Sequence, residues 1–368
     1  MRIGHSARAK AWVGLVVVGA LALAGCGGND ASGGDGDGGT LKIAYQGPLS
    51  GDNAQLGINM DNAAKLAVEQ ANESGDLPFK LEYTNVDDVG DPAQAPAATQ
   101  KLVDDSDVIA VAGPAFSGAT KASGPIFTQA NLAAVSPSAT NAELTQLGFS
   151  TFFRVVPADN VQGEKAAAYI ESLSQNKHLY LVDDKSEYGV GLADVIEDAL
   201  ADTDVKVDRE GVAPTKDYSA VATKIANSGA DTVYYAGYFA EGALFARALD
   251  ATTFEGNRLA GDGSNDDQFI AGAGDAAEGW QMTCACADAR IDPSAKSFVD
   301  AYTEAYGEAP GAYSAEAYDA TNTIISVLRG LDDPARESVV EGLRGVQYKG
   351  LVGDISFTED GEPTAGSI

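Results

Sequence analysis

The feature that most constrains the fold is a regular alternation of short apolar runs and helical stretches, which begins at Leu41. Runs such as Val108 to Gly113 are short, rich in β-branched residues and typical of buried strands. Stretches such as Ile58 to Asn72 carry apolar residues at helical spacing instead. This alternation predicts right-handed βαβ units around parallel sheets, which is the doubly wound, Rossmann-like α/β class.

The predicted elements cover almost all of the chain beyond residue 40. Strands are expected at Leu41 to Tyr45, Lys80 to Val86, Val108 to Gly113, Ala133 to Ser136, His178 to Val182, Val205 to Val212, Thr232 to Ala236, Arg258 to Ala260 and Gly279 to Ala285. Helices are expected at Ile58 to Asn72, Asp91 to Val103, Asn160 to Leu173, Gly189 to Ala201, Ser219 to Asn227, Ala240 to Asp250, Asp267 to Ala271, Ser294 to Tyr306, Ala312 to Arg329 and after Pro334. Asp354 to Phe357, followed by Asp360-Gly361, predicts a terminal hairpin.

This series is longer than one hydrophobic core usually spans, so two lobes are expected. The second βα series is followed by helices that must return to the first sheet. We therefore predict one lobe from residues 40–158 with 287–344, and another from residues 159–286 with 345–368.

The first 25 residues have the parts of a secretory signal peptide: a basic start, an apolar run and small residues before Cys26. The ending Leu23-Ala24-Gly25-Cys26 resembles the lipobox of bacterial lipoproteins, in which this cysteine is lipidated. Residues 26–39 are mostly Gly, Asp and Ser, which predicts a flexible tether. We expect a protein anchored by lipid to the outer face of the cytoplasmic membrane; the alternative is a plain signal peptide with an incidental cysteine.

Charge and cysteine content narrow the range of partners. The chain has 24 Lys and Arg against 54 Asp and Glu, a formal net charge of −30, and such an acidic chain repels nucleic acid. Only Cys284 and Cys286 remain in the folded part, too few for a disulfide scaffold. A local bridge between them is favoured over two free thiols, since the compartment is oxidising.

Small hydroxyl residues follow two neighbouring strands. Ser117 comes after the first, and Ser138 and Thr140 come after the second, with a new helix expected just beyond each group. Free N–H groups at a helix start, beside hydroxyls, suit a carboxylate or phosphate, and the crevice beyond the strand ends is where open α/β sheets bind ligands. The alternative is that Ser117 and Thr140 are ordinary helix caps.

Catalytic motifs are scarce. His178 is the only histidine beyond the leader, and it opens a predicted strand. The sequence has no Gly-x-Ser-x-Gly elbow, no P-loop and no Cys/His metal spacing, so we expect no metal and no cofactor. The polar side chains of this sequence can form hydrogen bonds and ion pairs, which indicates binding rather than turnover.

Several motifs resemble one family. They are Gln46-Gly-Pro-Leu-Ser-Gly51, Asp87-Asp88, Ser136-Pro-Ser-Ala-Thr-Asn-Ala-Glu-Leu-Thr145, Tyr188-Gly189, Tyr234-Tyr-Ala-Gly-Tyr238 and Gly274-Asp-Ala-Ala-Glu-Gly279. The sequence is similar to the type I periplasmic-binding fold and, within it, to the leucine/isoleucine/valine-binding proteins of ABC importers. The resemblance implies two lobes joined by three hinge crossings that close on a ligand, and a permease as partner.

The resemblance also implies roles for individual residues. Ser117 and Thr140, with the backbone at Ser138 and Ala139, would hold the carboxylate of an amino acid. Tyr188 and Tyr238 would come from the second lobe, and Asp262 would take the ammonium. Leu56 falls where branched-chain binders carry an aromatic side chain in the side-chain pocket, and Phe116 where some carry a disulfide cysteine.

The residues themselves agree with this assignment, because a zwitterion needs neutral donors at one end and an anion at the other. Tyr188 and Tyr238 as core aromatics and Asp262 as a turn residue are the structural alternatives. Three functions follow: a monomeric receptor that delivers an amino acid, a receptor for amides, urea or another small polar molecule, and an exported hydrolase that pairs Asp262 with Glu241.

Overall fold

The structure is a computed structural model that describes residues 41–173 and 177–364. The predicted signal peptide, Cys26 and the tether lie outside the described residues.

The first sheet has five parallel strands in the order β2-β1-β3-β4-β5. The strands are β1 (Leu41–Gly47), β2 (Leu81–Asp87), β3 (Val108–Ala112), β4 (Ala133–Ser136) and β5 (Phe152–Arg154). The last of these was not among the expected strands. Strand β3 is followed directly by Gly113, whose φ is +129°. A Cβ at this position would lie 2.5 Å from the Gln46 carbonyl oxygen, so only glycine fits.

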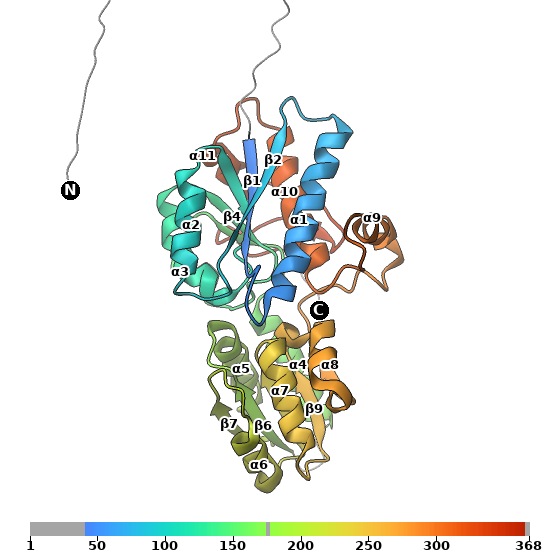
Figure 1. The fold of residues 1–368 in the computed structure, drawn as a ribbon. Coiled ribbons are helices and arrows are strands. Elements are labelled where there is room, and N and C mark those ends of the chain that lie inside the picture. The colour runs from blue at the N-terminus through green and yellow to red at the C-terminus, as the bar shows by residue number, and fades with distance from the viewer. Residues whose placement is uncertain (1–40, 174–176, 365–368) are drawn as a thin grey trace, which may run out of the picture. The chain divides into compact units, whose positions relative to one another are not determined.

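Helices cover both faces of this sheet (Figure 1). On one face lie α1 (Ala54–Ser74), α10 (Ser314–Arg329) and α11 (Arg336–Arg344), and on the other α2 (Ala95–Asp104) and α3 (Ser117–Gln129). Successive strand residues point to opposite faces, so Ile43 packs with the first set of helices and Ala44 with the second. This double burial explains why the inner strands β3 and β4 are almost wholly apolar.

The second sheet repeats this plan with the order β10-β9-β8-β6-β7, also parallel. Its strands are β6 (His178–Asp183), β7 (Lys206–Gly211), β8 (Thr232–Ala236), β9 (Asn257–Ala260) and β10 (Trp280–Met282). Helices α4 (Asp159–Leu173) and α5 (Glu187–Leu200) pack on one face, and α6 (Ser219–Ser228) and α7 (Phe239–Asp250) on the other. Beyond β9 come the 3-10 helix η2 (Asp262–Ser264), α8 (Asp267–Ala273) and the 3-10 helix η3 (Gly274–Ala277). The predicted α/β class with two doubly wound lobes is therefore confirmed.

Between β10 and α10 the chain returns to the first sheet through the 3-10 helix η4 (Pro293–Ala295) and α9 (Lys296–Tyr306). Cys284 and Cys286 form a disulfide in this passage, as favoured from the sequence. Helix α9 contacts α1, and α10 packs on α1 and on strands β3 and β4. The exact lobe boundaries stay a prediction.

The C-terminal segment differs from the expectation that residues 345–368 belong to the second lobe. The predicted hairpin is present, since Phe357 bridges to Pro363 around Gly361, next to the antiparallel pair β11 (Tyr348–Lys349) and β12 (Asp354–Ile355). Its apolar side chains, however, pack into the first sheet's core, where the ring of Phe357 lies 5.1 Å from that of Phe153. Burying these apolar groups there, together with an ion pair to Arg154, explains the placement.

Side chains join the two lobes at several points. Asn53 donates to Glu241 (3.0 Å), Asn59 donates to Asp266 (3.2 Å) and Lys121 pairs with Glu187 (2.6 Å). These contacts surround a small cavity between the sheets. Within residues 41–173 and 177–364, no helix is both long and apolar enough to cross a membrane.

Candidate functional site

The cavity lies beyond the carboxyl ends of strands in both sheets, and its own side chains nearly fill it, leaving a volume of about 10 Å³. It is lined by Leu56, Met60, Phe116, Ser117, Ser138, Tyr188, Tyr238, Asp262, Gly263 and Tyr313. Most of the residues predicted from the sequence are in this set. Ala139 and Thr140 are not in the lining, although they follow Ser138 directly.

Ser117 is the first residue of α3, and Phe116 rather than Ser117 occupies the N-cap position. Phe116 has an extended backbone and offers no side-chain cap, so the first N–H groups of the helix have no partner from a cap. The buried Ser117 hydroxyl accepts a hydrogen bond from the Asn141 N–H (3.3 Å). A helix start with free donors and a hydroxyl beside it can bind a carboxylate.

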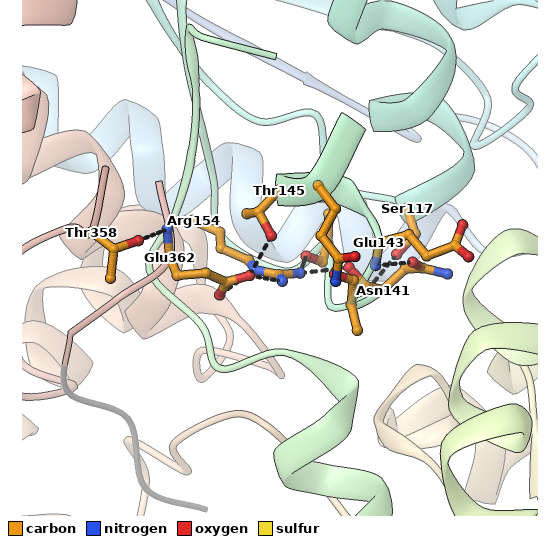
Figure 2. A network of polar contacts seen from close by, with 10 residues as sticks. Ser117, Asn141, Glu143, Thr145, Arg154, Thr358 and Glu362 are labelled. Atoms are coloured by element: carbon orange, nitrogen blue, oxygen red, sulfur yellow. Dashed lines mark hydrogen bonds and ion pairs between the residues drawn. The ribbon is translucent and has the colours of Figure 1, made fainter. Parts of the chain in front are cut away.

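No α-helix begins at Thr140, which corrects the expectation of a helix start there. The chain forms only a 3-10 helix, η1 (Leu144–Leu147). The reason is Arg154, whose Nη1 donates to the carbonyl oxygens of Ala139 (3.0 Å) and Asn141 (2.8 Å) and so holds the loop open (Figure 2). Asn141 then caps the next turn by accepting from the Glu143 N–H (2.8 Å).

Arg154 is itself fully buried and paired with Glu362 in the C-terminal hairpin. Thr145 also donates to Glu362 (2.7 Å), so the hairpin, β5 and the loop after β4 form one network (Figure 2). The loop after β4 is thereby held in place by Arg154 and the C-terminal hairpin. Sequence reasoning missed Arg154 because its partners lie far away in the chain.

Ser138, Ala139 and Thr140, in the loop after β4, differ in their hydrogen bonds. The Ser138 hydroxyl donates to the Ala115 carbonyl oxygen (2.8 Å), and the Ala139 N–H donates to Ser136 Oγ (3.0 Å). The Thr140 hydroxyl is buried and has no hydrogen-bond partner among the described residues. A nearby acceptor is the Asp159 carboxylate, whose pKa the Thr140 hydroxyl lowers.

Asp262 lies across the cavity, at the start of η2, and is almost fully buried. Its Oδ1 accepts from Gln162 (2.7 Å) and Tyr188 (2.8 Å), and its Oδ2 accepts from Tyr313 (2.6 Å). Burial raises the pKa of Asp262, while hydrogen bonds from Tyr313, Tyr188 and Gln162 lower it. Since a carboxylate accepts about four hydrogen bonds, Oδ2 has room for another donor.

A second buried acid, Asp159, was missed from the sequence. It begins α4, where an acidic residue is ordinary, and its backbone N–H donates to the Thr140 carbonyl oxygen (2.8 Å). Both of its carboxylate oxygens are buried without a hydrogen-bond partner among the described residues. Burial and the nearby Asp262 carboxylate raise its pKa well above the usual range. Asp159 therefore adds a second buried carboxyl group close to Asp262.

Aromatic and apolar side chains close the rest of the cavity. The ring of Phe116 stacks on that of Tyr238, with centroids 4.2 Å apart, and Tyr238 also contacts Tyr188 (5.3 Å). Leu56 and Met60 come from α1. A cavity that combines apolar side chains with neutral donors and one buried acid fits a small zwitterion with an apolar side chain.

The hydrolase hypothesis requires Asp262 to pair with Glu241, but the hydrogen bonds of each acid go to other residues. Glu241 accepts from Asn53 in the other lobe, and the acid that acts electrostatically on Asp262 is Asp159. In the described part of the chain no group of three His, Cys, Asp or Glu side chains is arranged to hold a metal ion.

Comparison with known proteins places this site in context. The sequence profile of a family described as periplasmic binding protein matches residues 40–367. The leucine-, isoleucine-, valine-, threonine- and alanine-binding protein of Pseudomonas aeruginosa is 32% identical over 326 residues, which cover 88% of this chain and 87% of that protein.

Solved structures give the same result. The branched-chain amino acid transporter substrate-binding protein LivJ from Streptococcus pneumoniae, in complex with isoleucine, is 27% identical with a TM-score of 0.79, over 88% of this chain and 94% of that one. A leucine-binding protein, LivK, from Thermotoga maritima is 26% identical with a TM-score of 0.78, over 88% and 93% of the two chains.

Proposed function

Because the chain belongs to the family of periplasmic binding proteins, we propose that it is the extracytoplasmic receptor of an ABC importer for an amino acid. The ligand is held between the two lobes and delivered to a permease, without turnover. An amino acid with an apolar side chain, branched-chain ones included, fits the wall formed by Leu56, Met60 and Phe116. Relatives named for such ligands support this choice.

The observation that carries the proposal is that one cavity is lined both by a buried acid, Asp262, and by Ser117 at the start of α3. The ligand carboxylate would bind at the start of α3 and at the Thr140 hydroxyl, where donors are free. The ligand ammonium would lie by Asp262, whose Oδ2 accepts from Tyr313 and has room for a further donor. The ammonium is then paired with an anion and the carboxylate with hydrogen-bond donors, as burial of a zwitterion demands.

We further propose that Cys26 is lipidated and that the mature protein is a monomer attached to the membrane by its N-terminus. The Leu-Ala-Gly-Cys sequence and the Gly- and Asp-rich residues after it support this attachment.

The direct test is a thermal-shift screen of the twenty amino acids on the fragment that starts at Thr40. A ligand present at about 100 times its dissociation constant should add about 2.7 kcal/mol to the free energy of unfolding. The binding stoichiometry of any hit is then measured by calorimetry, and the solution is checked for products. Stabilisation by urea or amides, with none by any amino acid, would replace the proposed ligand; product formation would make the protein an enzyme.

A further inference from the structure

Tyr313 occupies an unusual place at the cavity. It precedes α10, which packs on the first sheet, and it is buried with a φ of +64°, a backbone conformation rare outside glycine. Sequence analysis put it inside a helix, whereas α10 begins one residue later, at Ser314. Such a conformation persists only where surrounding structure fixes it, so the backbone at Tyr313 is held by its surroundings.

The hydroxyl of Tyr313 reaches an acid of the other lobe. It donates to Oδ2 of Asp262 at 2.6 Å, and Asp262 lies just after β9 of the second sheet. The other two donors to Asp262, Gln162 and Tyr188, come from α4 and α5 of the same lobe as Asp262 and bind the opposite oxygen. Tyr313 is thus the residue of the first lobe that donates to Asp262 Oδ2, the oxygen with room for the ligand.

We propose that Tyr313 is a positioning residue for the ligand's ammonium: its hydroxyl keeps the Asp262 carboxylate ionised and oriented toward the cavity when the lobes are closed. This inference rests on the proposed function, because it takes an ammonium to be the group that Asp262 binds. Tyr313 acts through Asp262, and its hydroxyl stays bound when the ligand is present, since Oδ2 can accept from both.

The charges around Asp262 make this support necessary. Asp159 faces it as a second acid, and the hydroxyl groups of Tyr188 and Tyr234 and the Tyr238 side chain lie close enough to interact with it. Burial raises the pKa of Asp262, and the hydrogen bond from Tyr313 is the largest influence that opposes this rise. Loss of the hydroxyl therefore favours the protonated acid, which cannot neutralise an ammonium.

The test is Tyr313→Phe, which removes the hydroxyl and keeps the ring. Tyr45→Phe is the matched control, because Tyr45 is also fully buried but its hydroxyl has no hydrogen-bond partner among the described residues. The probe is the L-amino acid, out of the twenty, that raises the melting temperature of the unmodified protein most. Its dissociation constant is measured by calorimetry from pH 4 to pH 9, and circular dichroism checks that each variant is folded.

We expect Tyr313→Phe to bind the probe roughly tenfold more weakly at neutral pH, as for a lost hydrogen bond to a charged group. Affinity is lost as pH falls and the acids become protonated, so the midpoint of this loss should move to higher pH in Tyr313→Phe. Tyr45→Phe should match the unmodified protein in both measures. A general loss of packing would weaken binding at every pH without moving the midpoint.

Two results would separate this inference from the function on which it rests. If Asp262→Asn loses affinity while Tyr313→Phe keeps both its affinity and its pH midpoint, the role of Tyr313 is wrong and the proposed function stands. If no amino acid binds, or if Asp262→Asn binds the probe as tightly as the unmodified protein, both fall together.

Discussion

Ser117 and Thr140 bring two hydroxyl groups to the ends of neighbouring strands, but the structure gives them different surroundings. The Ser117 hydroxyl already accepts a hydrogen bond from the Asn141 N–H, and it stands beside the free N–H groups of α3. The Thr140 hydroxyl is buried without a partner in the described part of the chain. A ligand carboxylate would gain from both, and from several backbone donors at once.

We predict that Ser117→Ala weakens amino-acid binding by about 1 to 3 kcal/mol, the usual cost of losing one hydrogen-bonding partner at a buried site. The effect is moderate because the N–H groups at the start of α3 still reach the carboxylate. Calorimetry on Ser117→Ala and on Ser172→Ala, a change at an exposed position of α4, gives the comparison. Equal affinities in the two variants would remove Ser117 from the site.

The sequence was sufficient to find residues whose role depends on their own strand end, such as Ser117, Tyr188 and Asp262. It was insufficient for residues whose role depends on distant partners. Asp159 looks like an ordinary acid in the first turn of a helix, and only the fold shows that it is buried beside Asp262. No local pattern distinguishes such a residue from a surface acid.

At the level of elements, helix α10 joins the first lobe to the passages between the sheets. Glu316 accepts a hydrogen bond from the Ala287 N–H (2.6 Å), and Asp319, less than one turn later, accepts from the Val352 N–H (2.8 Å). Both acids are buried, and the second oxygen of Glu316 has no partner among the described residues. Burial raises the pKa of Glu316 to about 8.

This pKa makes stability depend on pH. In the unfolded chain Glu316 ionises near its ordinary pKa, whereas in the folded protein it keeps its proton up to about pH 8. The folded state binds more protons in this window, so this group's contribution to stability is full at low pH and is lost as pH rises toward 8.

We predict that Glu316→Gln, which retains an oxygen for the Ala287 N–H, gains stability relative to the unmodified protein between pH 5 and pH 9. Relative to the unmodified protein, the free energy of unfolding of Glu316→Gln should be higher at pH 9 than at pH 5 by an amount on the order of several kcal/mol. Chemical denaturation at both pH values measures it, with Glu337→Gln on exposed α11 as control. Parallel pH profiles for the unmodified protein and Glu316→Gln would show that Glu316 is not buried as described.

Most strands and helices could be predicted because each follows from a local pattern of apolar residues. The loop after β4 could not, since Arg154 takes the carbonyl groups that a helix would have used. The C-terminal hairpin was predicted as a hairpin but assigned to the wrong sheet. The apolar residues of the hairpin would suit the core of either sheet. The hairpin packs on the first sheet because Phe357 contacts Phe153 and Glu362 binds Arg154, and these partners are 208 residues apart in the case of Arg154 and Glu362.

For the whole molecule, the proposed function depends on two lobes that close on the ligand and on a protein that stays near its permease. Contacts such as Asn53 with Glu241 and Asn59 with Asp266 join the lobes around the cavity. Side chains from both lobes line the cavity, so neither lobe forms the site alone. A ligand that contacts both lobes favours the closed form by its differential affinity for it.

We predict that Cys26→Ser releases the protein from the membrane to the soluble fraction, because the lipid needs the cysteine thiol and no other anchor is proposed. Fractionation of cells that express each form, followed by immunoblotting, measures the distribution. Cys284→Ser combined with Cys286→Ser is the control, since these cysteines pair with each other. A Cys26→Ser protein that stays membrane-bound would refute the anchor.

The central claim is that a buried carboxylate receives the ammonium of an amino acid, and Asp262→Asn tests it most directly. The change removes the charge and keeps the shape. A desolvated ammonium without its anion is costly, so binding measured by titration calorimetry should weaken by roughly 2 to 5 kcal/mol. The exposed Asp267→Asn, a few residues away, should bind as the unmodified protein does. If Asp262→Asn also binds the amino acid with unchanged affinity, no ammonium lies at Asp262, and the account is contradicted.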